Sequence, residues 1–144
     1  MSEQQARAQA LFNQDGYARH LGIELVEVGQ GRAVMEMEIQ DRHLNFLGAV
    51  HGGAIFSLAD MAFGLASNTE QSMRVGIDAH IAFVARVDQG ERIRASAFKF
   101  AENRRTAVYQ VNITRNAEAI ATFTGTVYIT NRPFSEALES PQAP

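Results

Sequence analysis

The stretch NFLGAVHGGAIFSLADMAFGLASN, residues 45–68, decides which fold this chain can adopt. From the second half of the HGG motif onward it is apolar on nearly every side, which predicts a helix over about 52–68 that other elements must cover. Two features are unusual for a plain core helix. It opens on a histidine followed by two glycines, and Asp60 places a carboxylate in its middle.

The segments around this helix alternate apolar and polar residues, which is the period of β-strands. Those on either side of Gly29-Gln30-Gly31 predict a hairpin. After the helix, alternating segments run to residue 130, and in the first of them the apolar residues from Met73 to Val87 share one face. A hairpin, one apolar helix and an antiparallel meander predict an α+β fold in which one curved sheet wraps around the helix.

The length of 144 residues suits one domain with a single core. We expect a surface helix in residues 1–20, the main domain in 21–131, and a flexible tail in 132–144, where all three prolines lie. The net charge of −3 gives no reason to expect a nucleic acid or an anionic membrane as a partner.

Cysteine is absent from the sequence, which excludes disulfides, thiolate nucleophiles and cysteine-based zinc sites. The first residues lack the basic-then-apolar pattern of a signal peptide. No apolar run reaches the roughly 18 residues that a membrane span needs. We therefore expect a cytoplasmic protein with no membrane partner.

Small and polar residues form one narrow stripe along the predicted helix: Gly53, Ser57, Asp60, Gly64 and Ser67. A ligand or another backbone can approach such a stripe closely. Partial desolvation there would raise the pKa of Asp60 and make it a better base. The alternative is an aspartate that faces water or makes a structural hydrogen bond. Because the rest of the helix is so apolar, a solvated face must be narrow, and this favours a functional role.

The start of the helix is the second element of a candidate site. A helix N-terminus presents unpaired N–H groups and the positive end of the dipole. The amides near Gly52 and Gly53 could stabilise an oxyanion, although two glycines before a helix are also ordinary turn chemistry. In the preceding loop, Asn45 could bind a substrate carbonyl or water, or could hold the loop as an Asx turn. His51 could donate to a substrate or simply fix the loop.

Gly52 and Asp60 are eight residues apart, roughly 12 Å along a helix. One carbonyl cannot contact both groups on the same helix. If both act, Asp60 must come from a second, antiparallel helix, which predicts a symmetric dimer with two composite sites. A two-fold partner that extends the sheet would also cover its exposed edge.

The motif NFLGAVHGGAIFSLAD resembles the signature of hotdog-fold acyl-CoA thioesterases of the PaaI type, found in phenylacetate degradation, within the 4-hydroxybenzoyl-CoA thioesterase superfamily. The likeness extends from about residue 20 to residue 130. It implies a hotdog fold, a homodimer often paired into a homotetramer, and no cofactor or metal. It also implies that the Gly52 amide polarises the thioester carbonyl with help from Asn45, and that His51 lies near the thioester. Asp60 of the partner chain would act as general base or nucleophile.

The sequence departs from this family at Gly76, in RVGID, where many relatives place a serine or threonine that helps to hold the attacking water. The resemblance therefore implies a hydroxyl that is either missing or supplied elsewhere. For the phosphates of coenzyme A it points to Arg104 and Arg105, with Arg115 and Arg132 as further candidates. The alternative for each arginine is a solvated surface charge.

Five apolar residues are candidates for an acyl pocket, and the alternative for each is a plain core position: Leu44, Phe46, Leu47, Met61 and Phe63. The other histidines have no partners at metal-ligand spacing and are expected to be structural or on the surface: His20, His43 and His80.

Three functions remain open from the sequence. The first is hydrolysis of an aryl- or medium-chain acyl-CoA, similar to phenylacetyl-CoA, to the free acid and coenzyme A. The second is a hotdog dehydratase or hydratase of 3-hydroxyacyl thioesters, in which His51 and Asp60 would form the catalytic pair. The third is a non-catalytic module that binds acyl-CoA. Asn45 and the HGG motif favour the first, whereas Gly76 leaves the third open.

Overall fold

The computed structural model describes residues 2–135. Its helices and strands are α1 (Glu3–Asn13), α2 (Gly16–Leu21), β1 (Glu24–Gly29), β2 (Arg32–Glu38), the short 3-10 helix η1 (Asp41–His43), α3 (Gly52–Ser67), β3 (Ser72–Phe83), β4 (Arg92–Glu102), β5 (Thr106–Arg115) and β6 (Glu118–Pro133).

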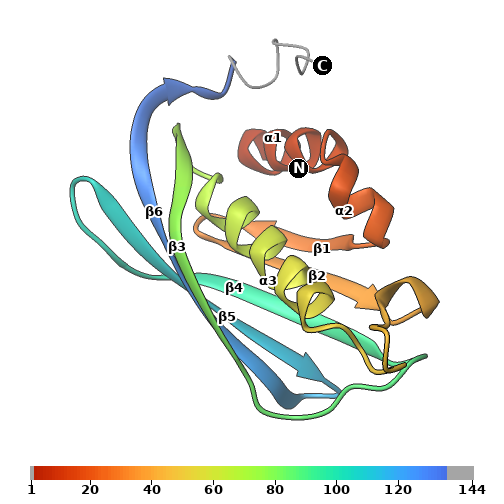
Figure 1. Cartoon of the computed structure of the whole chain (residues 1–144). Coiled ribbons are helices and arrows are strands. Elements are labelled where there is room, and N and C mark those ends of the chain that lie inside the picture. Colours follow the sequence, from red (N-terminus) through yellow and green to blue (C-terminus); the bar gives the residue numbers. More distant parts are fainter. Residues whose placement is uncertain (1, 136–144) are drawn as a thin grey trace.

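The strands form one antiparallel sheet in the order β1-β2-β4-β5-β6-β3. Figure 1 shows this sheet curving around α3, while α1 and α2 lie near β1 and α3. The predicted α+β hotdog architecture, a sheet wrapped around one apolar helix, is confirmed. The helix forms where expected because its apolar residues find the concave face of the sheet on one side.

Phe63 is the central side chain between α3 and the sheet. Its ring packs at 5.5 Å from that of Phe123 and at 6.0 Å from that of Tyr109, between ring centroids. The ring fits because two facing strand residues are glycines. A Cβ atom at Gly125 would lie 2.7 Å from the ring, and one at Gly76 would lie 3.2 Å from it. Gly76, although itself exposed, therefore leaves room for a ring of the core.

β3 departs from the strict alternation that the sequence predicted. The pairing of β3 with β6 shifts around Ile77, where one extra residue enters β3. Val75 then lies opposite the exposed Tyr128, whereas Ile81 lies opposite the buried Phe123. The apolar residues from 73 to 87 thus do not share one face, because a bulge reverses the side on which successive side chains point.

β3 is also an edge strand of the sheet. It pairs with β6 on one side, and within residues 2–135 no strand pairs with its other side. Residues 75–80 are all exposed, including Val75 at 51% and Ile77 at 57%. An exposed edge of this length offers unpaired backbone groups to another chain.

The two ends of the described chain meet near α1. Phe134, at the start of the predicted tail, is buried, and the Arg7 guanidinium lies 4.2 Å from the centre of its ring. The rest of that tail, residues 136–144, lies outside the described residues. The predicted N-terminal surface segment contains two helices, and none of the helices in residues 2–135 is long and apolar enough to cross a membrane.

Candidate active site

His43 anchors the loop that leads to α3. Its side chain is 1% exposed; Nδ1 accepts from the Gln40 amide at 2.9 Å, and Nε2 donates to the Leu21 carbonyl at 2.8 Å. The His43 carbonyl accepts from the His51 amide at 2.7 Å. Both ring nitrogens are satisfied, so His43 is structural, as predicted.

Asn45 holds the loop as an Asx turn, one of the two roles that the sequence left open. Its Oδ1 accepts from the amides of Leu47 at 2.9 Å and Ala49 at 3.1 Å, which makes it the organiser of the loop turn. Its Nδ2 has no hydrogen-bond partner among residues 2–135. One side chain therefore shapes the loop and still offers a donor beside the start of α3.

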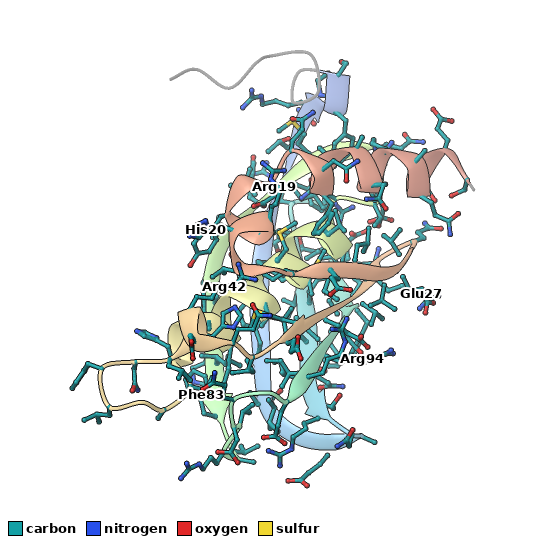
Figure 2. All side chains as sticks on the ribbon, turned by 90° about the vertical axis from the view of Figure 1, so that its right-hand side faces the viewer. Arg19, His20, Glu27, Arg42, Phe83 and Arg94 are labelled. Atoms are coloured by element: carbon teal, nitrogen blue, oxygen red, sulfur yellow. The ribbon has the colours of Figure 1, made fainter. Side chains whose placement is uncertain are left out.

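His51 caps α3 and thereby selects which amide remains available. Its Nδ1 accepts from the Gly53 amide at 2.8 Å, so the proton of the neutral ring is on Nε2. The Gly52 amide, by contrast, has no partner in the described part of the chain. Phe83, labelled in Figure 2, is the last residue of β3. Its ring lies 3.1 Å from the position of a Cβ atom at Gly52 and thus beside this helix start. Of the two candidate amides, only that of Gly52 is free to bind a ligand.

Asp60 projects from the middle of α3 and is exposed in the single chain. Nonpolar atoms around its carboxyl group still displace enough water to raise its pKa above the ordinary aspartate value, and the negative charge of Asp15 adds to this effect. No hydrogen bond or ion pair holds this carboxylate among residues 2–135. Asp60 is therefore a partly desolvated carboxylate without a hydrogen-bond or ion-pair partner in this part of the chain.

Two residues near Asp60 come from the α2 region and were not foreseen. Asp15 caps α2 by accepting from the Ala18 amide at 2.9 Å. The hydroxyl of Tyr17 lies 3.1 Å from that of Ser57, one helical turn before Asp60. An aspartate before a glycine can signal a helix start, but no spacing in the sequence shows that this helix packs on α3.

A groove of about 300 Å³ runs along α3 from Asp60. Its lining residues are Leu11, Asp15, Asp60, Met61, Gly64, Leu65, Asn68, Met73, Arg74 and Phe134. The predicted stripe is thus open at Asp60 and Gly64, whereas Ser67 is buried and Asn68 takes its place on this side.

The five predicted acyl-pocket residues lie in three different places. Met61 lines the groove, whereas Phe63 points into the core against Phe123. Leu44 is partly buried, and Phe46 and Leu47 project from the loop with 95% and 77% exposure. Gly76, the position without the expected hydroxyl, faces the ring of Phe63.

The predicted coenzyme A arginines lie at the turn between β4 and β5. Arg104 and Arg105 line a polar hollow of about 340 Å³ together with Tyr128, Ile129 and Asn131. Neither arginine forms an ion pair within residues 2–135. Arg115, in contrast, pairs with Glu91 and Glu118, each at 3.1 Å.

The two predicted catalytic groups, the Gly52 amide and the Asp60 carboxylate, do not lie close together within one chain. Gly52 and Asp60 occupy opposite halves of α3, roughly 12 Å apart, as the helical rise requires. No group of three or more histidine, aspartate or glutamate side chains among the described residues could hold a metal ion.

Known proteins are similar to this chain in fold and in sequence. Residues 47–121 match the model of a family described as the thioesterase superfamily. The chain is 34% identical over 125 residues to a putative esterase of Archaeoglobus fulgidus, covering 86% of this chain and 81% of the relative. It is 32% identical over 119 residues to the acyl-coenzyme A thioesterase PaaI of Escherichia coli K12, covering 82% and 85%. The solved structure of the Escherichia coli PaaI protein superposes with a TM-score of 0.86 at 29% identity, covering 90% of this chain and 95% of that one.

Proposed function

Because this chain belongs to the thioesterase superfamily, we propose that it hydrolyses an acyl-CoA thioester to the free acid and coenzyme A. One observation carries the proposal: a single helix presents both a free amide, at Gly52, and a partly desolvated, unengaged carboxylate, at Asp60. Thioester hydrolysis needs these two groups, a donor for the developing oxyanion and a base for the attacking water.

In the proposed reaction, the Gly52 amide and Asn45 Nδ2 donate to the thioester carbonyl oxygen. Asp60 takes a proton from water as the water oxygen attacks the carbonyl carbon. The tetrahedral intermediate then breaks its C–S bond, and Asp60 returns the proton to the leaving thiolate. In the other form of the mechanism, the Asp60 carboxylate attacks the carbonyl carbon and the C–S bond breaks to release the coenzyme A thiolate. Water then hydrolyses the resulting anhydride to the free acid and the regenerated Asp60. Both forms use an ionised Asp60 and need no metal or cofactor.

We propose that the reacting groups come together in a homodimer that pairs the β3 edges of two chains about a two-fold axis. Antiparallel pairing about the middle of β3 would bring Phe83 of one chain near Ser72 of the other. Phe83 lies beside Gly52, and the start of β3 lines the groove that opens at Asp60. The pairing would therefore set the Gly52 amide of one subunit opposite Asp60 of the other. Two such dimers would form the homotetramer that the resemblance implies.

The proposed dimer also gives the Arg104–Arg105 turn a role. Arg105 accepts a backbone hydrogen bond from Ile129, and Ile129 lies opposite Arg74 at the start of β3. The turn therefore lies near the start of β3, which is where Gly52 of the partner subunit would lie in the proposed dimer. Two arginines without ion-pair partners at this place suit the phosphates of coenzyme A.

For the acyl part, we propose an aryl or medium-chain group similar to phenylacetyl. The support is the likeness to the Escherichia coli PaaI protein, whose structure is described as from the phenylacetic acid degradation operon. His51 would position the thioester through its Nε2–H, because its Nδ1 is used to cap α3. That use also weighs against the hydratase, in which His51 would have to act as a base or acid.

The test is thiol release from a panel of phenylacetyl-, hydroxyphenylacetyl-, benzoyl- and straight-chain acyl-CoAs. We expect release with at least one member and its loss in Asp60→Asn. Absence of thiol from every thioester would contradict the proposal, and full activity of Asp60→Asn would contradict the role of that residue. Hydration of an enoyl-CoA without thiol release would support the hydratase instead.

A further inference from the structure

The groove beside Asp60 is lined by a glycine, Gly64, that the packing of the protein does not explain. Gly64 lies one turn after Asp60 on the same side of α3, within the helix. Its φ is not positive, and a Cβ atom placed on it would meet no atom within 4 Å. Glycine is among the poorest helix formers, so neither the backbone nor the neighbours account for it here. What its absent side chain leaves is open space in the groove.

Most of the side chains that line the groove are apolar and suit an apolar ligand. Leu11 comes from α1, Met61 and Leu65 from α3, Met73 from β3, and Phe134 from the segment after β6. The volume of about 300 Å³ is at the lower end of the range typical of small-molecule sites, about 300–1,000 Å³. A ring or a chain of moderate length would fill it.

The charges in the groove exclude the phosphate end of the substrate. Its only cationic lining residue is Arg74, which is neutralised by Glu70 at 2.7 Å and Glu102 at 2.5 Å. Asp15 and Asp60 contribute negative charge at the other end. An anionic nucleotide would be repelled, whereas an uncharged hydrocarbon would not.

We infer that this groove holds the acyl group of the thioester and that Gly64 sets the upper limit on its size. The inference rests on the proposed thioesterase function and extends it to the acyl specificity of the same site. With the reacting carbonyl at Asp60, the acyl group extends over Gly64 toward Asn68. A side chain at position 64 would occupy the space that the distal atoms of a large acyl group need.

The test compares Gly64→Leu and Gly64→Ala with the wild type. For acetyl-CoA, whose acyl group has the fewest atoms to place over position 64, we expect the smallest loss of kcat/KM. For phenylacetyl- and octanoyl-CoA we expect Gly64→Leu to lower kcat/KM by about tenfold or more, and Gly64→Ala by less. Both variants should melt at a temperature no lower than the wild type, because alanine and leucine favour a helix more than glycine does. A folding defect therefore cannot imitate the expected result.

A binding measurement keeps this inference separate from the hydrolytic proposal. Ethyl- and octyl-CoA thioethers are not hydrolysed, and we expect Gly64→Leu to weaken only the octyl compound. This readout applies even if the wild type releases no thiol. Ala6→Leu is the matched control, because it adds a leucine at an exposed position of α1 outside the groove.

Two results would overturn the inference. One is an equal effect of Gly64→Leu on small and large acyl groups, or no effect on either, in both assays. The other is a change in the solution mass of Gly64→Leu, which would show that a second protein chain, and not the acyl group, fills the groove.

Discussion

Of the two glycine amides at the start of α3, that of Gly52 is free, because His51 caps that of Gly53. Proline is accepted at the first position of a helix, and the extended conformation of His51 (φ −69°, ψ 126°) is compatible with a following proline. We expect Gly52→Pro to remove the amide proton, keep the helix and lower kcat by about 10²–10³-fold relative to Gly52→Ala. Both variants place a Cβ atom against Phe83, so their ratio reports the loss of the N–H together with the proline ring carbon that replaces its hydrogen. Equal kcat values would contradict the role of this amide.

The pKa of Asp60 connects the rate of hydrolysis with pH. Desolvation raises this pKa first, and the charge of Asp15 raises it further. Because the ionised form is the active one, the rate should rise with pH as Asp60 loses its proton, above the usual range for an aspartate. We expect Asp15→Asn to remove one of the two causes and to move this acidic limb of the pH–rate profile to lower pH.

Asparagine is as good a helix cap as aspartate, so Asp15→Asn should preserve α2. The control is Asp88→Asn, in the exposed turn before β4, which should leave the limb where it is. An acidic limb unchanged in Asp15→Asn would show that Asp15 does not influence the base.

For single residues of the candidate site, the sequence predicted which side chains and amides to consider but not their hydrogen bonds. Gly52 and Asp60 followed from the helix start and from the one polar stripe on an apolar helix. That Gly53 is engaged by His51, and that Asn45 keeps a free Nδ2, depends on side-chain rotamers that spacing does not determine. The approach of Asp15 to Asp60 depends on how α2 packs, which is a tertiary contact.

The turn between β5 and β6 contains strained backbone. Asn116 and Ala117 have φ values of 48° and 66°, which suit the favoured Asn-Gly pair of a tight hairpin but not alanine. We expect Ala117→Gly to stabilise the protein by about 0.5–1 kcal/mol, because the lost strain exceeds the added freedom of the unfolded chain. Urea unfolding measures this. As a control, Ala119→Gly in the adjacent strand should lower the free energy of unfolding. If Ala117→Gly lowered it by a similar amount, the backbone at position 117 would not be strained.

The contact between α3 and the sheet explains why residue 76 carries no hydroxyl. Phe63 occupies the space that a side chain at Gly76 would enter. We expect Gly76→Ser to cost about 1–3 kcal/mol in the free energy of unfolding, as other overpacked cores do. Adding Phe63→Leu should recover part of this cost, so the two substitutions should not be additive in a double-mutant cycle. Strict additivity, with Phe63→Leu measured alone as the control, would show that the ring is not the obstacle.

Among the elements, the helix and the strands were predictable and the bulge was not. The helix was predicted over about 52–68 and runs over Gly52–Ser67, because its apolar pattern and its glycine start both mark it. The register shift at Ile77 is not visible in the sequence, since apolar and polar residues alternate without a break across this position. The shift is set by the hydrogen bonds to β6, which the sequence of β3 alone does not contain.

The edge of the whole sheet is where a second molecule is expected. We expect Ile77→Lys to produce a monomer that remains folded but releases little thiol, because two like charges would face each other near the two-fold axis. Light scattering gives the mass, and circular dichroism checks the fold. Val26→Lys, exposed on the strand at the opposite edge, is the matched control and should remain a dimer. A fully active monomer would contradict the shared site.

The distance between the two ends of α3 has a genetic consequence. In the proposed dimer, one site uses the Gly52 end of the first copy and the Asp60 end of the second, and the other site uses the reverse pair. Two alleles, one carrying Gly52→Pro and the other Asp60→Asn, would be null when each is alone. In a cell that expresses both, every mixed dimer contains one site with both defects and one with neither. Random assembly makes half of the dimers mixed, so the cross restores about a quarter of the wild-type activity.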